Sequence, residues 1–174
     1  RWYTLREVLP EGSQDLANLE QLIAQVENPT EPQQEQVPDI DAMVIQLKEK
    51  LEAEPDNPSG WFMLGRSYMV MKRFPDAVSA FEEAHRQSPQ DAETKLSLAD
   101  ALAMTSGGKL AGRPAQLVDE ALALAPDNPK ALWLAGMAAR EMNNNEQAVA
   151  YLQKLLPLLA SDPQSSEEVK SLIL

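Results

Sequence analysis

Hydrophobic residues recur every three or four positions in several short stretches of this chain, and prolines or glycines separate the stretches. In residues 13–27 the apolar residues on one helical face are Leu16, Leu19, Leu22, Ile23 and Val26. This spacing predicts an amphipathic helix. Residues 28–38 hold three prolines, three glutamines and two glutamates, which predict an extended linker. We therefore expect a domain boundary between residues 1–38 and 39–174.

The helical periodicity continues from residue 39 to the C-terminus. Val44, Leu47 and Leu51 form an apolar stripe that predicts a helix over residues 41–54. Pro157 is expected to end or bend a later helix. The other predicted helices cover 59–71 and 75–87, begin near residues 92, 114 and 129, and end with a capping helix within 163–174. The pattern is typical of an all-α fold.

These helices belong to a sequence repeat. Residues 55–58 and 126–129 are both Pro-Asp-Asn-Pro, and Pro89 lies between them, 34 residues after Pro55. The residues that resemble the tetratricopeptide repeat (TPR), counted from Pro58, are Trp61, Leu64, Gly65, Tyr68, Ala77, Phe81, Ala84 and Pro89. The resemblance implies a TPR solenoid of about three helical hairpins with flanking N- and C-terminal helices. The repeats cover about 58–91, 92–128 and 129–160.

The repeat has two irregularities. Pro89 to Pro126 spans 37 residues, so the second repeat contains three extra residues. We assign them to 105–113, where three glycines predict a longer loop in place of the usual tight turn. In the third repeat, Leu132 stands at the packing position that Trp61 holds in the first, and Trp133 follows it. The indole is therefore expected to face the groove.

Several repeat positions have packing roles. Gly65, Ala99 and Gly136 share one position, where a small residue allows the two helices of a hairpin to approach closely. Trp61 and Phe81 are expected to be structural. Replacing either with Ala is expected to cost about 3 to 5 kcal/mol.

In a TPR array, positions 2, 5, 9, 12 and 13 of the first helix of each repeat line a concave groove. Here they are Ser59, Phe62, Arg66, Met69, Val70, Glu93, Leu96, Asp100, Ala103, Met104, Lys130, Trp133, Met137, Arg140 and Glu141. The residues that we select as a peptide-binding groove are Phe62, Arg66, Met69, Leu96, Asp100, Met104, Trp133, Met137 and Arg140. The apolar members would accept the apolar face of an amphipathic helix, and the charged ones would set its register.

Two other interpretations of this surface stay open. Trp133 and the methionines could contact only neighbouring helices, because apolar stripes at helical spacing usually belong to a core. Alternatively, the helix over residues 13–27 could lie in the groove. In that case deletion of residues 1–38 would change the affinity for a peptide.

Composition and charge exclude several classes of function. A formal net charge of −12 repels phosphate backbones and anionic lipid surfaces, so nucleic-acid binding is not expected. No apolar run approaches the roughly 18 residues that span a bilayer. The chain begins with Arg1 rather than Met, and we expect a targeting or membrane segment upstream of it.

The sequence also lacks the usual combinations of catalytic or metal-binding residues. It has no cysteine, and His85 is the only histidine, which argues against metal sites and histidine-based triads. Residues 106–109, Ser-Gly-Gly-Lys, resemble a phosphate loop, but Ala103 and Leu110 replace residues that this motif requires. We expect a protein that is not an enzyme and that binds no cofactor.

Three segments resemble a narrower family than TPR proteins in general. They are residues 61–68 (WFMLGRSY), residues 99–108 (ADALAMTSGG) and residues 125–136 (APDNPKALWLAG). Together they are similar to the CcmI/CycH family of cytochrome c biogenesis, with the nitrite-reductase haem-lyase subunit NrfG as a related possibility. The similarity covers about residues 39–160.

This resemblance implies a periplasmic TPR domain, attached to the inner membrane by an upstream segment. It implies a chaperone that captures the C-terminal amphipathic helix of apocytochrome c and presents it to other haem-ligation proteins, without binding haem itself. An alternative is a TPR scaffold that docks folded subunits of an assembly complex. A co-chaperone that clamps a C-terminal carboxylate would need Lys and Asn where this chain has Phe62 and Arg66.

Overall fold

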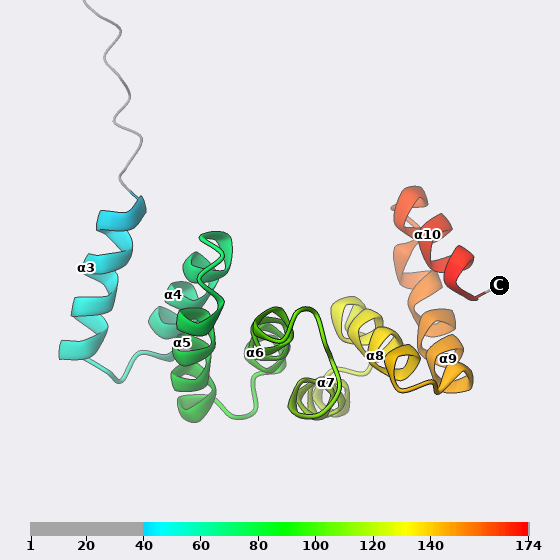
Figure 1. Cartoon of the computed structure of the whole chain (residues 1–174), viewed down its shortest axis with the longest axis horizontal. Helices are drawn as coiled ribbons and strands as arrows, with labels where there is room; N and C mark the ends of the chain where they lie inside the picture. Colours follow the sequence, from blue (N-terminus) through cyan, green and yellow to red (C-terminus); the bar gives the residue numbers. More distant parts are fainter. Residues whose placement is uncertain (1–39, 174) are drawn as a thin grey trace, which may run out of the picture. The chain divides into compact units, whose positions relative to one another are not determined.

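The computed structural model describes residues 40–173 of the chain. The chain divides into two compact units, Arg1–Met43 and Val44–Leu174, and the description below concerns the second unit. The helix predicted over residues 13–27 and the linker over 28–38 lie outside the described residues. The described part is helical throughout and contains no strand, as the sequence pattern predicted (Figure 1).

The helices agree closely with the predicted ranges. The last α-helix of the third repeat ends at Leu155, and a 3-10 turn containing Pro157 follows it, so the prediction that this proline ends the helix is confirmed. The elements are α3 (Ile40–Ala53), α4 (Pro58–Val70), α5 (Phe74–Gln87), α6 (Ala92–Thr105), α7 (Arg113–Leu124), α8 (Pro129–Glu141), α9 (Asn145–Leu155), η1 (Leu156–Leu159) and α10 (Pro163–Ile173).

The helices pack as three consecutive hairpins. α4 packs on α5, α6 on α7 and α8 on α9, while α5 also contacts α6 and α7 contacts α8 (Figure 1). The short helix α10 packs against α9 and η1. These pairings confirm the predicted TPR arrangement, in which each hairpin contacts the next one along the chain.

The repeated Pro-Asp-Asn-Pro tetrapeptide starts the first helix of two repeats. The side chain of Asn57 accepts a hydrogen bond from the N–H of Gly60 at 2.9 Å, and that of Asn128 accepts one from Ala131 at 3.0 Å. In each case the following proline occupies the first helical position, where a missing N–H costs nothing. The tetrapeptide is therefore an N-cap followed by an N1 proline.

The turn inside each repeat is built in the same way. Lys72 and Asn143 have left-handed backbones, with φ of 56° and 58°, and Gly107 has φ of 69°. The N–H of the residue after each bonds to a carbonyl five residues back, at 2.8 Å in all three repeats. The second repeat therefore keeps the tight turn and adds a loop after it, whereas the sequence predicted that the loop would replace the turn.

The added loop is attached to the third repeat. The N–H of Leu110 donates a hydrogen bond to the Glu141 carboxylate at 2.7 Å, and the Leu110 side chain is 7% exposed. Gly112, with φ of 87°, then leads into α7. We call residues 109–112 with their bond to Glu141 the inter-repeat clasp.

The small residues at the shared repeat position permit close helix packing. A Cβ atom added to Gly65 would lie 2.6 Å from the ring of Phe81, and one added to Gly136 would lie 3.0 Å from Leu152. Phe81 is almost fully buried. The packing roles predicted for Gly65, Gly136 and Phe81 are confirmed.

The repeats differ in the residue that occupies the packing position of Trp61. Trp61 is half-buried and donates its indole N–H to the Pro55 carbonyl at 2.8 Å. Leu132, its counterpart in the third repeat, is buried. The counterpart in the second repeat is Lys95, whose side chain is only 7% exposed and forms an ion pair with Glu120 of α7. The sequence reading did not anticipate this buried lysine.

Candidate peptide-binding groove

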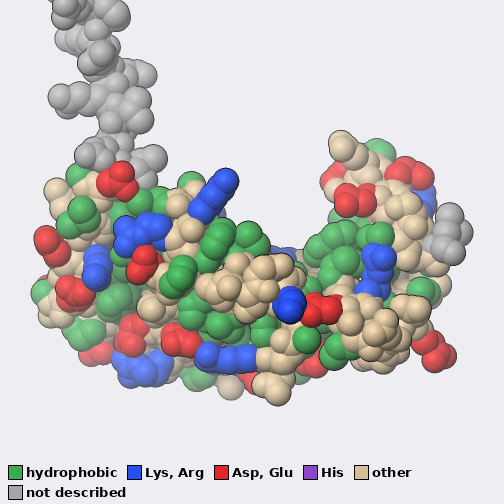
Figure 2. All heavy atoms as spheres, viewed as in Figure 1, with side chains coloured by type: hydrophobic (Ala, Val, Ile, Leu, Met, Phe, Trp, Pro, Cys, Tyr) green, Lys and Arg blue, Asp and Glu red, His purple; other side chains and the backbone are tan. Residues whose placement is uncertain are grey.

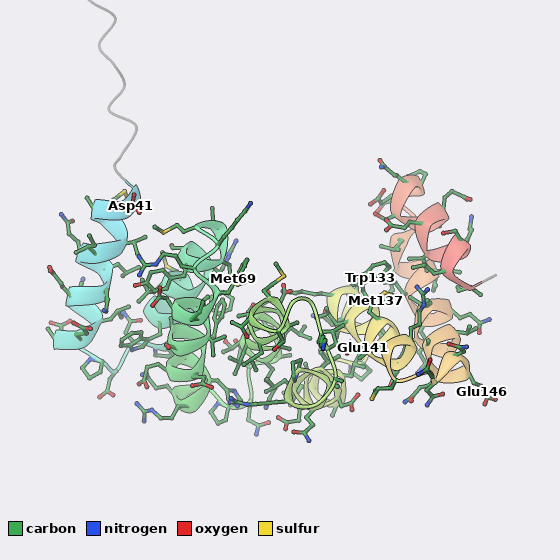
Figure 3. All side chains as sticks on the ribbon, viewed as in Figure 1. Asp41, Met69, Trp133, Met137, Glu141 and Glu146 are labelled. Carbon is green, nitrogen blue, oxygen red and sulfur yellow. The ribbon has the colours of Figure 1, made fainter. Side chains whose placement is uncertain are left out.

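The predicted groove residues come from α4, α6 and α8, the first helices of the three repeats. Met69 lies on α4, and Trp133 and Met137 lie on α8 (Figure 3). The second unit is hollowed on one side, and hydrophobic side chains are exposed there (Figure 2). Two cavities formed by the described residues include predicted groove positions in their walls.

The first cavity has a volume of about 350 Å³ and a charged lining. Arg66 and Met69 of α4 border it together with Asp100 of α6, so three of the nine selected residues share one hollow. The complete lining is Arg66, Met69, Val70, Phe81, Glu93, Ser97, Asp100 and Lys130. Among these lining residues, Phe81 and Ser97 do not occupy groove positions of the TPR spacing.

The second cavity has a volume of about 270 Å³ and lies where α8, α9, η1 and α10 meet. Trp133 forms part of its wall, and its half-buried side chain also packs against both hydrophobic clusters of the core. Its lining is Pro129, Lys130, Trp133, Leu155, Leu159, Ser165, Glu168 and Val169. Lys130 borders both cavities.

The remaining selected residues lie outside the two cavities. Phe62 is half-buried, and its ring lies 5.6 Å from that of Phe81 in a tilted arrangement. Met104 is 44% exposed and Arg140 is exposed, while Met137 is half-buried and packs against the core. These four side chains keep accessible surface that a ligand could contact.

Leu96 requires a correction. The sequence placed it in the groove, but its side chain is 0% exposed and belongs to the main hydrophobic core. α6 is the middle one of the three first helices and contacts α4, α5 and α7, so its position 5 is enclosed. A ligand therefore cannot reach Leu96 in this structure.

The sequence did not predict that residues of η1 and α10 would line a cavity beside the groove. Leu159, Glu168 and Val169 lie beyond the third repeat, and TPR spacing assigns groove positions only within repeats. The apolar spacing of residues 165–174 indicated a helix that covers the last hairpin. It did not indicate that this helix forms the wall of a cavity containing Trp133.

The charges beside the first cavity are only partly neutralised. Lys130 and Asp100 form an ion pair at 3.5 Å, and each side chain is 39% exposed. Arg66 and Arg140 form no ion pair within residues 40–173. Glu141 is occupied by its bond to Leu110. Glu93, which also lines the first cavity, forms no ion pair in this range either, so the groove offers a ligand charged groups of both signs.

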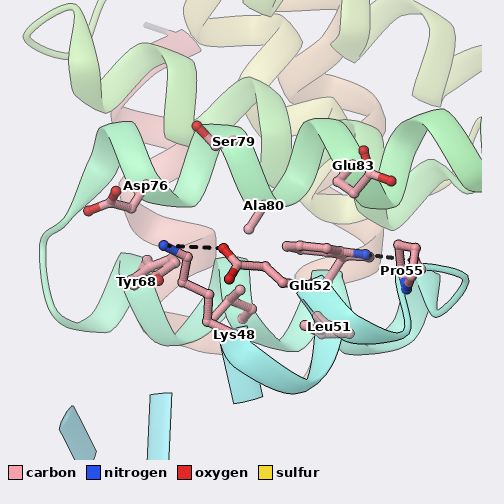
Figure 4. A pocket seen from close by; sticks show the side chains of 11 residues that line it. Lys48, Leu51, Glu52, Pro55, Tyr68, Asp76, Ser79, Ala80 and Glu83 are labelled. Atoms are coloured by element: carbon pink, nitrogen blue, oxygen red, sulfur yellow. Dashed lines mark hydrogen bonds and ion pairs between the residues drawn. The ribbon is translucent and has the colours of Figure 1, made fainter. Parts of the chain in front are cut away.

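A third cavity lies elsewhere, between α3, α4 and α5 (Figure 4). Its volume is about 560 Å³, and it includes none of the predicted groove positions. The carboxylates at its edge already have partners: Glu52 pairs with Lys48 at 3.5 Å, Asp76 with Arg73 at 2.8 Å, and Glu83 with Arg86. Each of these three carboxylates therefore has an ion-pair partner in the structure.

Among residues 40–173, no group of three or more His, Asp and Glu side chains is placed to hold a metal ion. No helix in the same range is long and apolar enough to cross a membrane. His85 lies on α5, where burial and the nearby Lys95 lower its pKa. Such a shift is ordinary for an enclosed structural histidine.

Three stacked hairpins with a hollowed side that carries apolar and charged groups define a TPR protein, a class that binds other proteins. A crystal structure of MamA has the same fold, with a TM-score of 0.63 at 19% sequence identity, over 78% of this chain and 85% of that one. The family model described as the cytochrome c-type biogenesis protein H TPR domain matches residues 9–166. The chain belongs to this family.

Curated relatives point in the same direction. The cytochrome c-type biogenesis protein CycH of Pseudomonas aeruginosa is 34% identical over 128 residues, which cover 73% of this chain and 31% of that protein. The formate-dependent nitrite reductase complex subunit NrfG of Escherichia coli O157:H7 is 26% identical over 132 residues, covering 76% of this chain and 67% of that subunit. The chain thus spans about a third of the length of the CycH relative. It is a TPR module of cytochrome c-type biogenesis.

Proposed function

We propose that this TPR module captures the C-terminal amphipathic helix of apocytochrome c and presents it for haem ligation in the periplasm. It acts by binding, and other proteins of the maturation system perform the covalent chemistry. An upstream segment would attach the module to the inner membrane.

The observation that carries the proposal is the pair of adjoining cavities on the groove side of the repeats. Trp133 and Met69 supply apolar surface, and Arg66, Asp100 and Lys130 supply charge beside it. An amphipathic helix presents the same combination, because its apolar stripe is flanked by polar residues. The family membership makes a cytochrome of the maturation system the expected source of such a helix.

The expected affinity is moderate. A client that must be handed to a ligation enzyme has to leave the groove, so a dissociation constant in the micromolar range, about −8 kcal/mol, suits this role. The exposed methionine Met104 and the half-buried Met69 and Met137 would allow the groove to accept several client sequences, because unbranched methionine side chains adapt their shape.

The proposal is tested by titrating fluorescently labelled C-terminal helices of c-type cytochromes with the chain and measuring anisotropy. Trp133→Ala is expected to weaken binding at least about tenfold, the usual effect of removing a central aromatic anchor. Leu124→Ala is the matched control, because Leu124 is exposed on α7 and borders neither cavity. Equal affinity of the native chain and the Trp133 variant for every helix would rule out this groove as the site.

A further inference from the structure

Lys130 and Trp133 lie three residues apart on α8 and therefore project from the same face of that helix. Lys130 borders both cavities, and Trp133 borders the second one. Two groups on a bound helix that meet them would also lie about one turn apart. The spacing of these two side chains thus defines a geometric requirement for the ligand.

The second cavity suits a single large apolar side chain. Its accessible apolar walls are the half-buried side chains of Trp133 of α8 and Leu159 of η1, whereas Leu155 and Val169, which also border it, are each only 2% exposed. An apolar cavity of about 150 Å³ holds a benzene molecule, so a hollow of about 270 Å³ has room for one Phe or Leu side chain. α10 is therefore part of the binding surface as well as a cover for the last hairpin.

The ammonium group of Lys130 is only loosely held by its present partner. The Lys130–Asp100 distance of 3.5 Å is longer than the roughly 2.7 to 2.9 Å of a strong charge-assisted hydrogen bond, and both side chains are 39% exposed. Exposed pairs of this kind contribute little to stability. A carboxylate of a bound ligand could replace Asp100 at small cost.

We propose that this end of the groove selects its client. The Trp133 cavity takes one large apolar side chain of the client helix, and Lys130 pairs with an Asp or Glu one helical turn away on the same face. The inference rests on the proposed function, since it specifies which helices that groove prefers. Asp100 competes with the client carboxylate for Lys130.

The competition gives variants with opposite expected effects. The probe is the tightest-binding synthetic cytochrome helix, compared with versions in which its acidic residue is changed to Gln or its large apolar residue to Ala. Lys130→Met is expected to weaken binding of the acidic helix about two- to fivefold, the range of an exposed ion pair. Asp100→Asn is expected to strengthen it by a similar factor. Neither variant should change the affinity for the Gln helix.

The apolar part of the proposal has its own comparison. Leu159→Phe partly fills the second cavity. It is expected to lower the affinity for the unmodified cytochrome helix and to leave unchanged the affinity for the version whose large apolar residue is Ala. Lys109→Met is the matched control for charge, because Lys109 is exposed in the added loop and borders neither cavity. Circular dichroism of each variant verifies that the helices are retained.

The outcomes separate this inference from the proposed function. Suppose that Trp133→Ala abolishes binding but Lys130→Met lowers the affinities for the acidic helix and the Gln helix equally. The groove is then retained as the binding site, and the proposed preference for a carboxylate is overturned. If Leu159→Phe lowers the affinities for the unmodified helix and for its Ala version by the same factor, the proposed selectivity of the apolar cavity is overturned. If no cytochrome helix binds the native chain, both proposals fall.

Discussion

His85 on α5 is half-buried, and its Nδ1 atom is enclosed without a hydrogen-bond partner among the described residues. Burial lowers its pKa below the ordinary value of 6.5, and Lys95 and Arg113 lower it further, against the opposing effect of Glu120 and Glu82. The folded chain therefore binds a proton at this site less readily than the unfolded chain. Stability is then lost as the pH falls below 6.5.

We expect the free energy of unfolding, measured by urea denaturation, to decrease as the pH is lowered from 7 to the pKa of His85 in the folded chain. His85→Gln should flatten this part of the curve. The lowered pKa values of Glu83 and Glu120 act in the same direction, but only below their ordinary value of 4.5. An unchanged slope above pH 5 in the variant would show that another group titrates there.

Gly65 and Gly136 offer a graded test of helix contact within a hairpin. A Cβ at Gly65 would lie 2.6 Å from a buried ring, whereas one at Gly136 would lie 3.0 Å from a leucine methyl group. Gly65→Ala is expected to destabilise by about 1 to 3 kcal/mol through overpacking. Gly136→Ala should cost less, because the leucine has only to shift slightly. Thermal or urea unfolding of both variants measures the difference, and the reverse order would contradict the packing described here.

Leu96, which the sequence pattern placed in the groove, and Lys95, whose burial the pattern did not predict, are explained by one physical cause. Leu96 follows the groove spacing but is enclosed because neighbouring helices flank α6. Lys95 is buried although lysine is usually exposed, because Glu120 of the next helix supplies its counter-charge. Both outcomes depend on contacts between helices. The repeat pattern specifies a position within its own helix and leaves such contacts undetermined.

At the scale of elements, the Pro-Asp-Asn-Pro tetrapeptides make the helix starts predictable. Asn128→Ala removes the side-chain acceptor for the N–H of Ala131 and is expected to destabilise by about 1 kcal/mol. Asn128→Asp keeps an acceptor at this position and is the control, with little expected change in the urea midpoint. Equal losses in the two variants would mean that the amide of Asn128 has a role other than capping α8.

The sequence predicted the boundaries of the helices more accurately than the form of the connections between them. Proline positions and apolar spacing predicted the starts of α4, α5, α6, α7 and α8 to within one residue, because both act within one turn of the chain. The added loop was located within 105–113, yet its form was not predicted. Gly107 preserves the turn of the other repeats, and the clasp to Glu141 depends on a residue 31 positions from Leu110.

At the scale of the whole molecule, the net charge of −12 acts on how fast ligands arrive. We expect the association rate of a cationic helix to fall with added salt and that of an anionic helix to rise, as measured by stopped-flow fluorescence. The preference of Lys130 for a carboxylate is local and should appear mainly in the dissociation rate. Association rates independent of salt for both helices would contradict a long-range effect of the charge.

The inter-repeat clasp also bears on how this protein can be rebuilt. In a regular TPR array any repeat can be removed or exchanged, because each interface is equivalent. Here the loop of the second repeat is bonded to the end of the first helix of the third, so these two repeats form one transplantable part. A chimera that exchanges the second and third repeats together should fold better than one that divides them. The unit of modular engineering in this chain is therefore a pair of hairpins.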